Sequence, residues 1–132
     1  MSGKGVASNR ILVVIAEPAT RGLVQRILES VLLHVDTASR YEQAIDKIRA
    51  GAFDVLVLDP ALPRVDGAEL LRTLQREHPR LARRTIVLAE PGSPIAEKLA
   101  AVPTCRRVSR AVRRQELIAA VSDCLRDMDD QS

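Results

Sequence analysis

Aromatic residues are nearly missing from this 132-residue sequence, which contains no tryptophan, one tyrosine and one phenylalanine. Proteins that bind single-stranded nucleic acid stack the bases on aromatic side chains, so we do not expect this chain to bind nucleic acid directly. No apolar run approaches the length that crosses a bilayer, and we therefore expect no membrane partner. The two cysteines, Cys105 and Cys124, have no ligand pattern around them. They predict neither a zinc site nor a disulfide framework, but ordinary thiols.

The length of the chain is that of one compact domain with a real core. Residues 1–9 are small and polar and lack the apolar stretch of a secretory signal, so we interpret them as the flexible leader of a cytoplasmic protein. The domain is expected at residues 10–128. Acidic residues gather near the end of the chain, and residues 129–132 are expected to form a disordered tail.

Short apolar runs alternate with segments of helical periodicity. Ile11–Ile15 and Val55–Leu58 are continuous apolar runs, which is typical of strands buried on both faces. Asp66 and Ser93 are predicted helix caps, because each precedes a helical pattern with a polar oxygen in the capping position. Strands are predicted at 11–15, 34–38, 55–58, 85–88 and 104–108. Helices are predicted at 19–33, 41–51 and 95–101, after the Asp66 cap with Leu70, Leu71 and Leu74 facing inward, and from 116 onward.

Five strands alternating with five helices require parallel crossovers, which predicts an α/β fold with a doubly wound five-stranded parallel sheet of order 2-1-3-4-5, the flavodoxin-like arrangement. Ligand sites in such sheets lie beyond the carboxyl ends of the strands, near the switch between strands one and three. This rule brings Glu17, Asp59, Ala89 and Arg110 to one rim, although they are far apart in the sequence.

Three segments resemble a known family. They are Ile11–Pro18, Val55–Gly67 and the start of the last helix at Glu116-Leu117, and within the second the stretch Asp-Pro-Ala-Leu-Pro-Arg-Val-Asp-Gly follows an apolar strand. Over nearly its whole length the chain resembles the CheY-like receiver domain of bacterial two-component response regulators. The resemblance implies the receiver fold and makes Asp59 the phosphoacceptor candidate, the aspartate that takes a phosphoryl group from a histidine kinase. A carboxylate at an exposed strand end can act as such a nucleophile.

The sequence departs from the family where the family binds its metal. The acidic pair of the receiver pattern matches Ile15 and Ala16, and neither side chain can bind a cation. Mg²⁺ requires oxygen ligands and usually takes carboxylates. Glu17 and Asp59 remain as the only candidate metal ligands, so no cofactor is predicted and Mg²⁺-dependent phosphorylation is expected to be impaired or absent.

Three further family positions are also changed. The hydroxyl at the end of strand four is replaced by Leu88 or Ala89, depending on the alignment of the loop. The lysine matches Arg110, which keeps the positive charge but not the geometry of a lysine. The switch aromatic matches Arg107, so a ring that moves beside a hydroxyl cannot operate here.

A dense group of arginines is the predicted interaction surface. It lies on the face made by helix four, strand five and helix five, which in the resembling family is the usual dimerisation and output face. Guanidinium groups suit carboxylates on a protein partner. We expect a histidine kinase or an output protein as partner, with a homodimer as a further possibility. The residues of this surface are Arg106, Arg107, Arg110, Arg113 and Arg114.

Three classes of function stay open, and an enzyme is not among them. The first is an atypical receiver that acts as a protein-interaction switch in a phosphorelay. The second is a working phosphoacceptor receiver that a histidine kinase phosphorylates at Asp59. The third is a flavodoxin-like nucleotide or flavin binder. The segment Glu17-Pro18 speaks against the third class, because it offers no glycine-rich or hydroxyl-rich loop to hold a phosphate.

Overall fold

The computed structural model of the chain describes residues 9–99, 104 and 106–130. In chain order its elements are β1 (Arg10–Val14), α1 (Pro18–Glu29), β2 (His34–Ala38), α2 (Tyr41–Ala50), β3 (Val55–Leu58), α3 (Gly67–Glu77), α4 (Pro79–Arg83), β4 (Thr85–Leu88), α5 (Pro94–Lys98), β5 (Arg106–Val108) and α6 (Arg114–Asp130).

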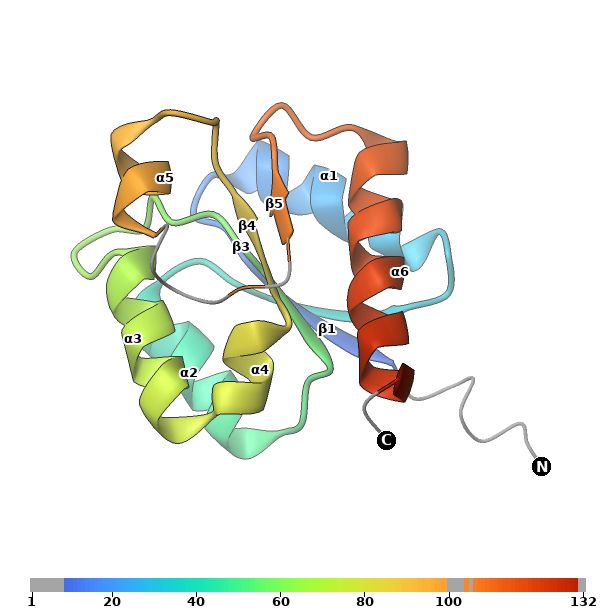
Figure 1. Cartoon of the computed structure of the whole chain (residues 1–132), viewed down its shortest axis with the longest axis horizontal. Coiled ribbons are helices and arrows are strands. Elements are labelled where there is room, and N and C mark those ends of the chain that lie inside the picture. Colours follow the sequence, from blue (N-terminus) through green and yellow to red (C-terminus); the bar gives the residue numbers. More distant parts are fainter. Residues whose placement is uncertain (1–8, 100–103, 105, 131–132) are drawn as a thin grey trace.

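The strands form one parallel sheet in the order β2-β1-β3-β4-β5, which confirms the predicted topology. Helices cover both faces of this sheet (Figure 1). The side chains of α1 and α6 pack on one face, and those of α2, α3, α4 and α5 pack on the other. Residues of β1, β3 and β4 contribute to both clusters because successive side chains of a strand point to opposite faces. The apolar runs are therefore the centre of the domain.

Two predicted helix caps are present. The Asp66 carboxylate accepts a hydrogen bond from the backbone N–H of Glu69 at 3.1 Å and begins α3. The Ser93 hydroxyl accepts one from the N–H of Ala96, also at 3.1 Å, and Pro94 follows at the first helical position of α5. Both caps satisfy backbone donors that have no partner within the helix.

The first helix is shorter than the sequence predicts. It ends at Glu29 rather than at residue 33, because the chain turns at Leu32, which has a φ of 67° and a side chain that is 87% exposed. The apolar spacing thus continues past the end of the helix. The predicted end of the helix at 95–101 lies outside the described residues, as does Cys105.

Other differences concern the second half of the chain. The described residues contain six helices rather than five, since Pro79–Arg83 forms the short helix α4. Only Leu81 and Ala82 are buried there, too few for a recognisable period. The last helix continues to Asp130, into the segment expected as a tail.

Cys124 is disulfide-bonded, so the prediction of an ordinary thiol is wrong at this position. No helix among the described residues is long and apolar enough to cross a membrane.

Candidate functional site

Asp59 lies where the resemblance places it, directly after β3 at the carboxyl end of the sheet. Val14 and Leu58 are register partners, and the N–H of Asp59 donates to the carbonyl of Val14 at 2.9 Å. Ile15 and Ala16, which follow β1 directly, therefore lie next to the backbone of Asp59. The Asp59 side chain is only 5% exposed, so its carboxylate depends on protein partners.

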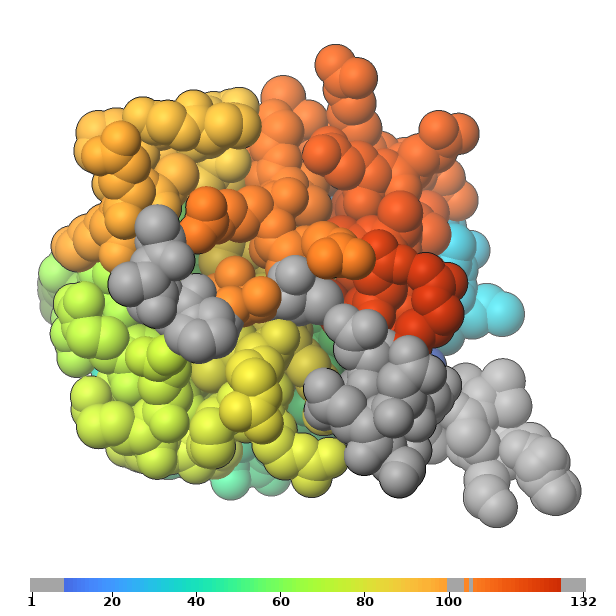
Figure 2. All heavy atoms as spheres, viewed as in Figure 1, coloured from blue at the N-terminus to red at the C-terminus, as the bar shows by residue number. Residues whose placement is uncertain are grey.

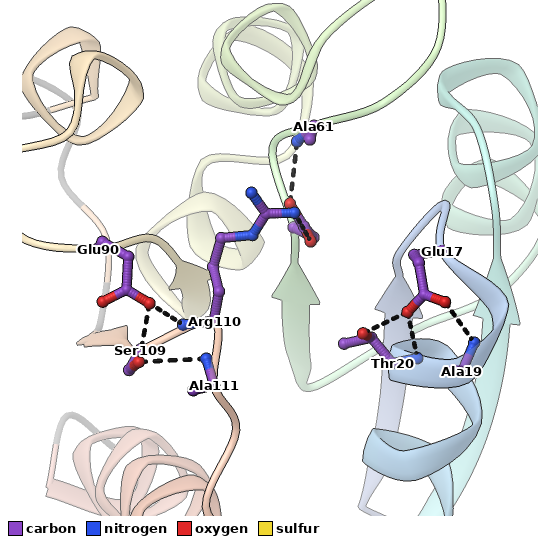
Figure 3. A network of polar contacts seen from close by, with 9 residues as sticks. Glu17, Ala19, Thr20, Ala61, Glu90, Ser109, Arg110 and Ala111 are labelled. Atoms are coloured by element: carbon purple, nitrogen blue, oxygen red, sulfur yellow. Dashed lines mark hydrogen bonds and ion pairs between the residues drawn. The ribbon is translucent and has the colours of Figure 1, made fainter.

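Arg110 supplies the main partner of that carboxylate. Its Nη2 lies 3.0 Å from Oδ2 of Asp59, and the N–H of Ala61 donates to Oδ1 at 3.0 Å. Figure 3 shows the Arg110 side chain reaching from the connection after β5 to the end of β3. Two residues that sequence reasoning assigned to the same rim thus form one ion pair across 51 positions of sequence. About half of the Arg110 side chain stays exposed.

A second carboxylate holds the backbone from which Arg110 extends. Oε2 of Glu90 accepts a hydrogen bond from the Ser109 hydroxyl at 3.0 Å and another from the N–H of Arg110 at 3.2 Å. The Ser109 hydroxyl oxygen also accepts from the N–H of Ala111 at 3.2 Å. The connection after β4 is thereby tied to the connection after β5 (Figure 3). Sequence reasoning missed Glu90 and Ser109, because nothing in their spacing pairs them.

The strand-four position offers no hydroxyl to the site. Leu88 is the last residue of β4, is fully buried and pairs with Val108 in the sheet. Ala89 follows it, with a methyl side chain that is 3% exposed and an N–H that donates to the carbonyl of Val108 at 2.9 Å. Both candidates for this position are therefore committed to the core and the sheet edge.

Glu17 is the N-cap of α1. Its two carboxylate oxygens accept hydrogen bonds from the N–H of Thr20, at 2.6 Å, and from the N–H of Ala19, at 3.0 Å, and the Thr20 hydroxyl donates as well. The hydroxyl of Thr20 is the largest cause that holds the pKa of Glu17 below its usual value, followed by the backbone bonds. Figure 3 shows this cap as a separate network at the start of α1. The carboxylate is thus already engaged in starting the helix.

A cation from α1 reaches the positions that match the family's acidic pair. Nη1 of Arg21 donates to the carbonyl of Ile15 at 3.0 Å and to that of Ala16 at 3.1 Å. The Ile15 side chain is fully buried, and that of Ala16 packs against the core. A guanidinium group therefore binds the backbone oxygens of the two residues that match the family's acidic pair.

The residues present do not fit the Mg²⁺ that the fold family implies. This ion takes a near-octahedral shell of oxygen ligands and is usually held through carboxylates. Here both Asp59 oxygens have donors, Glu17 caps a helix, and Arg21 places positive charge on the neighbouring carbonyls. Within 9–99, 104 and 106–130 no three His, Cys, Asp or Glu side chains are grouped so that they could hold a metal ion.

The five arginines of the predicted interaction surface have different surroundings. Arg110 binds Asp59, Nη2 of Arg106 lies 2.9 Å from Oδ2 of Asp123, and Nη1 of Arg114 donates to the Ser30 hydroxyl at 2.8 Å. Arg106 is the main cause that lowers the pKa of Asp123, which also contacts Arg126. Arg107 and Arg113 are exposed and, among the described residues, have no ion-pair partner. The surface and the homodimer stay predictions.

Most of the chain matches known protein sequences. Residues 11–122 match the family model of the response regulator receiver domain. Among curated proteins, a protein-glutamate methylesterase/protein-glutamine glutaminase 1 of Hahella chejuensis is 38% identical over 88 residues, which cover 65% of this chain and 24% of that protein. The transcriptional regulatory protein TcrA of Mycobacterium tuberculosis is 38% identical over 72 residues, 54% of this chain and 28% of TcrA. The chain thus spans about a quarter of the length of these relatives.

Solved structures show the same fold. A CheY-like response regulator receiver domain protein from Methanospirillum hungatei superposes with a TM-score of 0.85 at 21% identity, over 94% of this chain and 98% of that one. The chemotaxis response regulator CheY4 of Vibrio cholerae superposes with a TM-score of 0.77 at 19% identity, over 88% of this chain and 98% of CheY4.

Proposed function

The chain belongs to the response regulator receiver domain family, and we propose that it is a pseudo-receiver. In this proposal it is a cytoplasmic protein-interaction domain of a two-component phosphorelay, and its conformation is set by its partners rather than by Mg²⁺-dependent phosphorylation. The observation that carries the proposal is the state of Asp59. Its carboxylate is bound by Arg110 and Ala61, while the positions that match the acidic pair are Ile15 and Ala16.

The chemistry of phosphoryl transfer supports this proposal. In such transfers charge builds on the equatorial oxygens of the phosphoryl group, and a metal ion neutralises it. The Asp59 carboxylate that would attack is paired with Arg110 through Oδ2, and Ala16 has no carboxylate to hold a metal beside the incoming phosphate. No hydroxyl is available at Leu88 or Ala89 to donate to a phosphoryl oxygen. Each loss removes stabilisation of the transition state rather than of the fold.

The ion pair also suggests how a partner would act. Arg110 links the end of β3 to the connection after β5, and Glu90 links that connection to the one after β4. A histidine kinase or output protein that binds one arrangement of these loops more tightly shifts the population toward it. The signal then travels without a phosphoryl group.

The working phosphoacceptor is the second candidate, and one observation favours it. Asp59 keeps its place at the end of β3, followed by a Pro-bounded loop that ends at the capping Asp66. The two candidates differ in whether Asp59 accepts phosphate when Mg²⁺ is present.

Intact-mass measurement with acetyl phosphate and millimolar Mg²⁺ separates the two. We expect the mass to stay that of the unmodified chain, as in the Asp59→Asn control. The Ala16→Asp variant, alone or with Ile15→Asp, restores the missing carboxylates and is the matched gain-of-function variant. Stoichiometric, Mg²⁺-dependent addition of one phosphoryl group to the native chain, absent in Asp59→Asn, would overturn the pseudo-receiver and establish the second candidate.

A further inference from the structure

A cleft lies at the end of the sheet opposite Asp59. It has a volume of about 500 Å³ and sits at the amino ends of β3 and β4, beside the connection from α3 to α4. Figure 2 shows α4, in yellow, at the molecular surface next to α3. Neither the predicted site nor the predicted interaction surface includes a residue of this cleft. Its walls include Phe53, Asp54, Glu77, Arg80, Leu81 and Arg84.

The acidic side chains of the cleft already have partners. Oδ2 of Asp54 accepts a hydrogen bond from the N–H of Arg10 at 2.8 Å, and Oε1 of Glu77 lies 3.2 Å from Nη2 of Arg49. The basic side chains differ. In the described part of the chain, neither Arg80 nor Arg84 makes an ion pair or a side-chain hydrogen bond.

Arg84 is the more informative of these two arginines. It is partly buried, and its pKa is lowered, first by this burial and then by the like charges of Arg80 and Arg83; the charge of Asp54 opposes the effect. The guanidinium group of Arg84 is thus repelled by two others nearby in sequence and has lost part of its hydration. An anion in the cleft, between Arg80 and Arg84, would offset this repulsion.

The walls also include an apolar part. Phe53 packs against the core and carries the Arg10 guanidinium over its ring, 4.8 Å from the centroid. Leu81, which is 8% exposed, also lines the cleft. A cavity of about 500 Å³ is in the range of small-molecule sites, which combine apolar walls with a few charged groups.

We propose that this cleft binds a small organic phosphate, with Arg80 and Arg84 as the phosphate ligands; ADP serves as the probe of that class. A guanidinium group presents parallel N–H donors that match two phosphate oxygens, so two arginines that form no ion pair among the described residues favour a phosphate over a single carboxylate. The proposal is independent of the pseudo-receiver, since Asp59 and Arg110 lie at the other end of the sheet.

Amide NMR titration of the whole chain at low salt tests the proposal. The probes are ADP, adenosine and inorganic phosphate, measured against sulfate as a control anion. We expect saturable shifts at Asp54 and Arg84 with ADP, weaker shifts at the same amides with phosphate, and none with adenosine. Equal affinities for ADP and inorganic phosphate would assign the site to the free ion and overturn the proposal of an organic ligand. No saturable shift with either would overturn all of it.

Variants locate the binding. Arg80→Gln with Arg84→Gln removes two charges from the cleft, and we expect ADP affinity to fall about tenfold or more, because two charge-assisted contacts are lost. Arg26→Gln with Arg40→Gln removes the same charge outside the cleft and is expected to leave affinity within about twofold. Arg80→Gln alone, at an exposed residue, keeps the test valid if the double variant does not fold. Equal losses in the cleft pair and the control pair, or binding of an acidic peptide but not of ADP, would contradict the proposal.

Discussion

Removing the Arg110 side chain tests whether the ion pair with Asp59 holds the rim together. The carboxylate is 5% exposed and the arginine 49% exposed, so the pair stands between a surface salt bridge and a buried one. Exposed pairs contribute about 0.2–1 kcal/mol, and hydrogen bonds to charged groups about 1.5–3 kcal/mol. From this intermediate burial we expect a coupling free energy of about 1–2 kcal/mol between the two side chains.

The assay is a double-mutant cycle from Arg110→Ala, Asp59→Ala and the double variant, with free energies of unfolding measured in urea. Arg110→Ala alone should destabilise the domain by about 1–2 kcal/mol, because the nearly buried carboxylate then keeps only the N–H of Ala61 as a donor. Arg107→Ala is the control, since Arg107 is an exposed arginine of β5 and its loss should change stability by about 0.5 kcal/mol or less. Additive single effects, with a coupling below about 0.3 kcal/mol, would refute the reasoning.

Three further predictions concern stability. Asp66→Ala should cost about 1 kcal/mol at neutral pH through loss of the α3 cap. The hydrogen bond from the N–H of Glu69 lowers the pKa of Asp66 in the folded state. The stabilisation by this cap is therefore present above the unfolded pKa of about 3.9 and disappears as pH falls through the lower folded pKa. Urea unfolding at pH 7 and near pH 3 checks this. Gly67→Ala should cost about 1–3 kcal/mol, because a Cβ there would lie 2.5 Å from Cα of Pro60, and a Tm unchanged from the native chain would refute this. Gly22→Ala, within α1 and with only a flexible side chain at 3.4 Å, should instead stabilise by about 0.5–1 kcal/mol in the same thermal assay.

The sheet was predictable because its strands differ sharply from their surroundings. Ile11–Ile15 and Val55–Leu58 are uninterrupted apolar runs. The rule that parallel crossovers are right-handed then favours the strand order 2-1-3-4-5, which the structure has. The rule for parallel sheets also predicted that Asp59 and Arg110 share one rim, because it collects residues from the carboxyl ends of strands, but it did not predict their ion pair. The order of the strands and the position of the rim could thus be predicted from segments with a clear apolar pattern.

Contacts that depend on a single side chain were not predictable. The sequence makes Glu17 a candidate metal ligand, yet in the structure it caps α1, and both roles use the same carboxylate oxygens. Arg21 reaches back to the carbonyls of Ile15 and Ala16 from one turn into the helix, and no spacing rule announces such a contact. The short helix α4 has too few residues to show a period. Which of several nearby hydrogen-bond partners a side chain binds is decided by local geometry that the sequence does not show.

In our proposal, the site around Asp59 does not bind Mg²⁺. An amide NMR titration of the chain with Mg²⁺ tests this most directly. We predict that the amides of Ala16, Asp59 and Ala61 keep their positions at millimolar Mg²⁺, with the Ala16→Asp variant as the positive control. Saturable shifts of these amides in the native chain, lost in Asp59→Asn, would contradict the account.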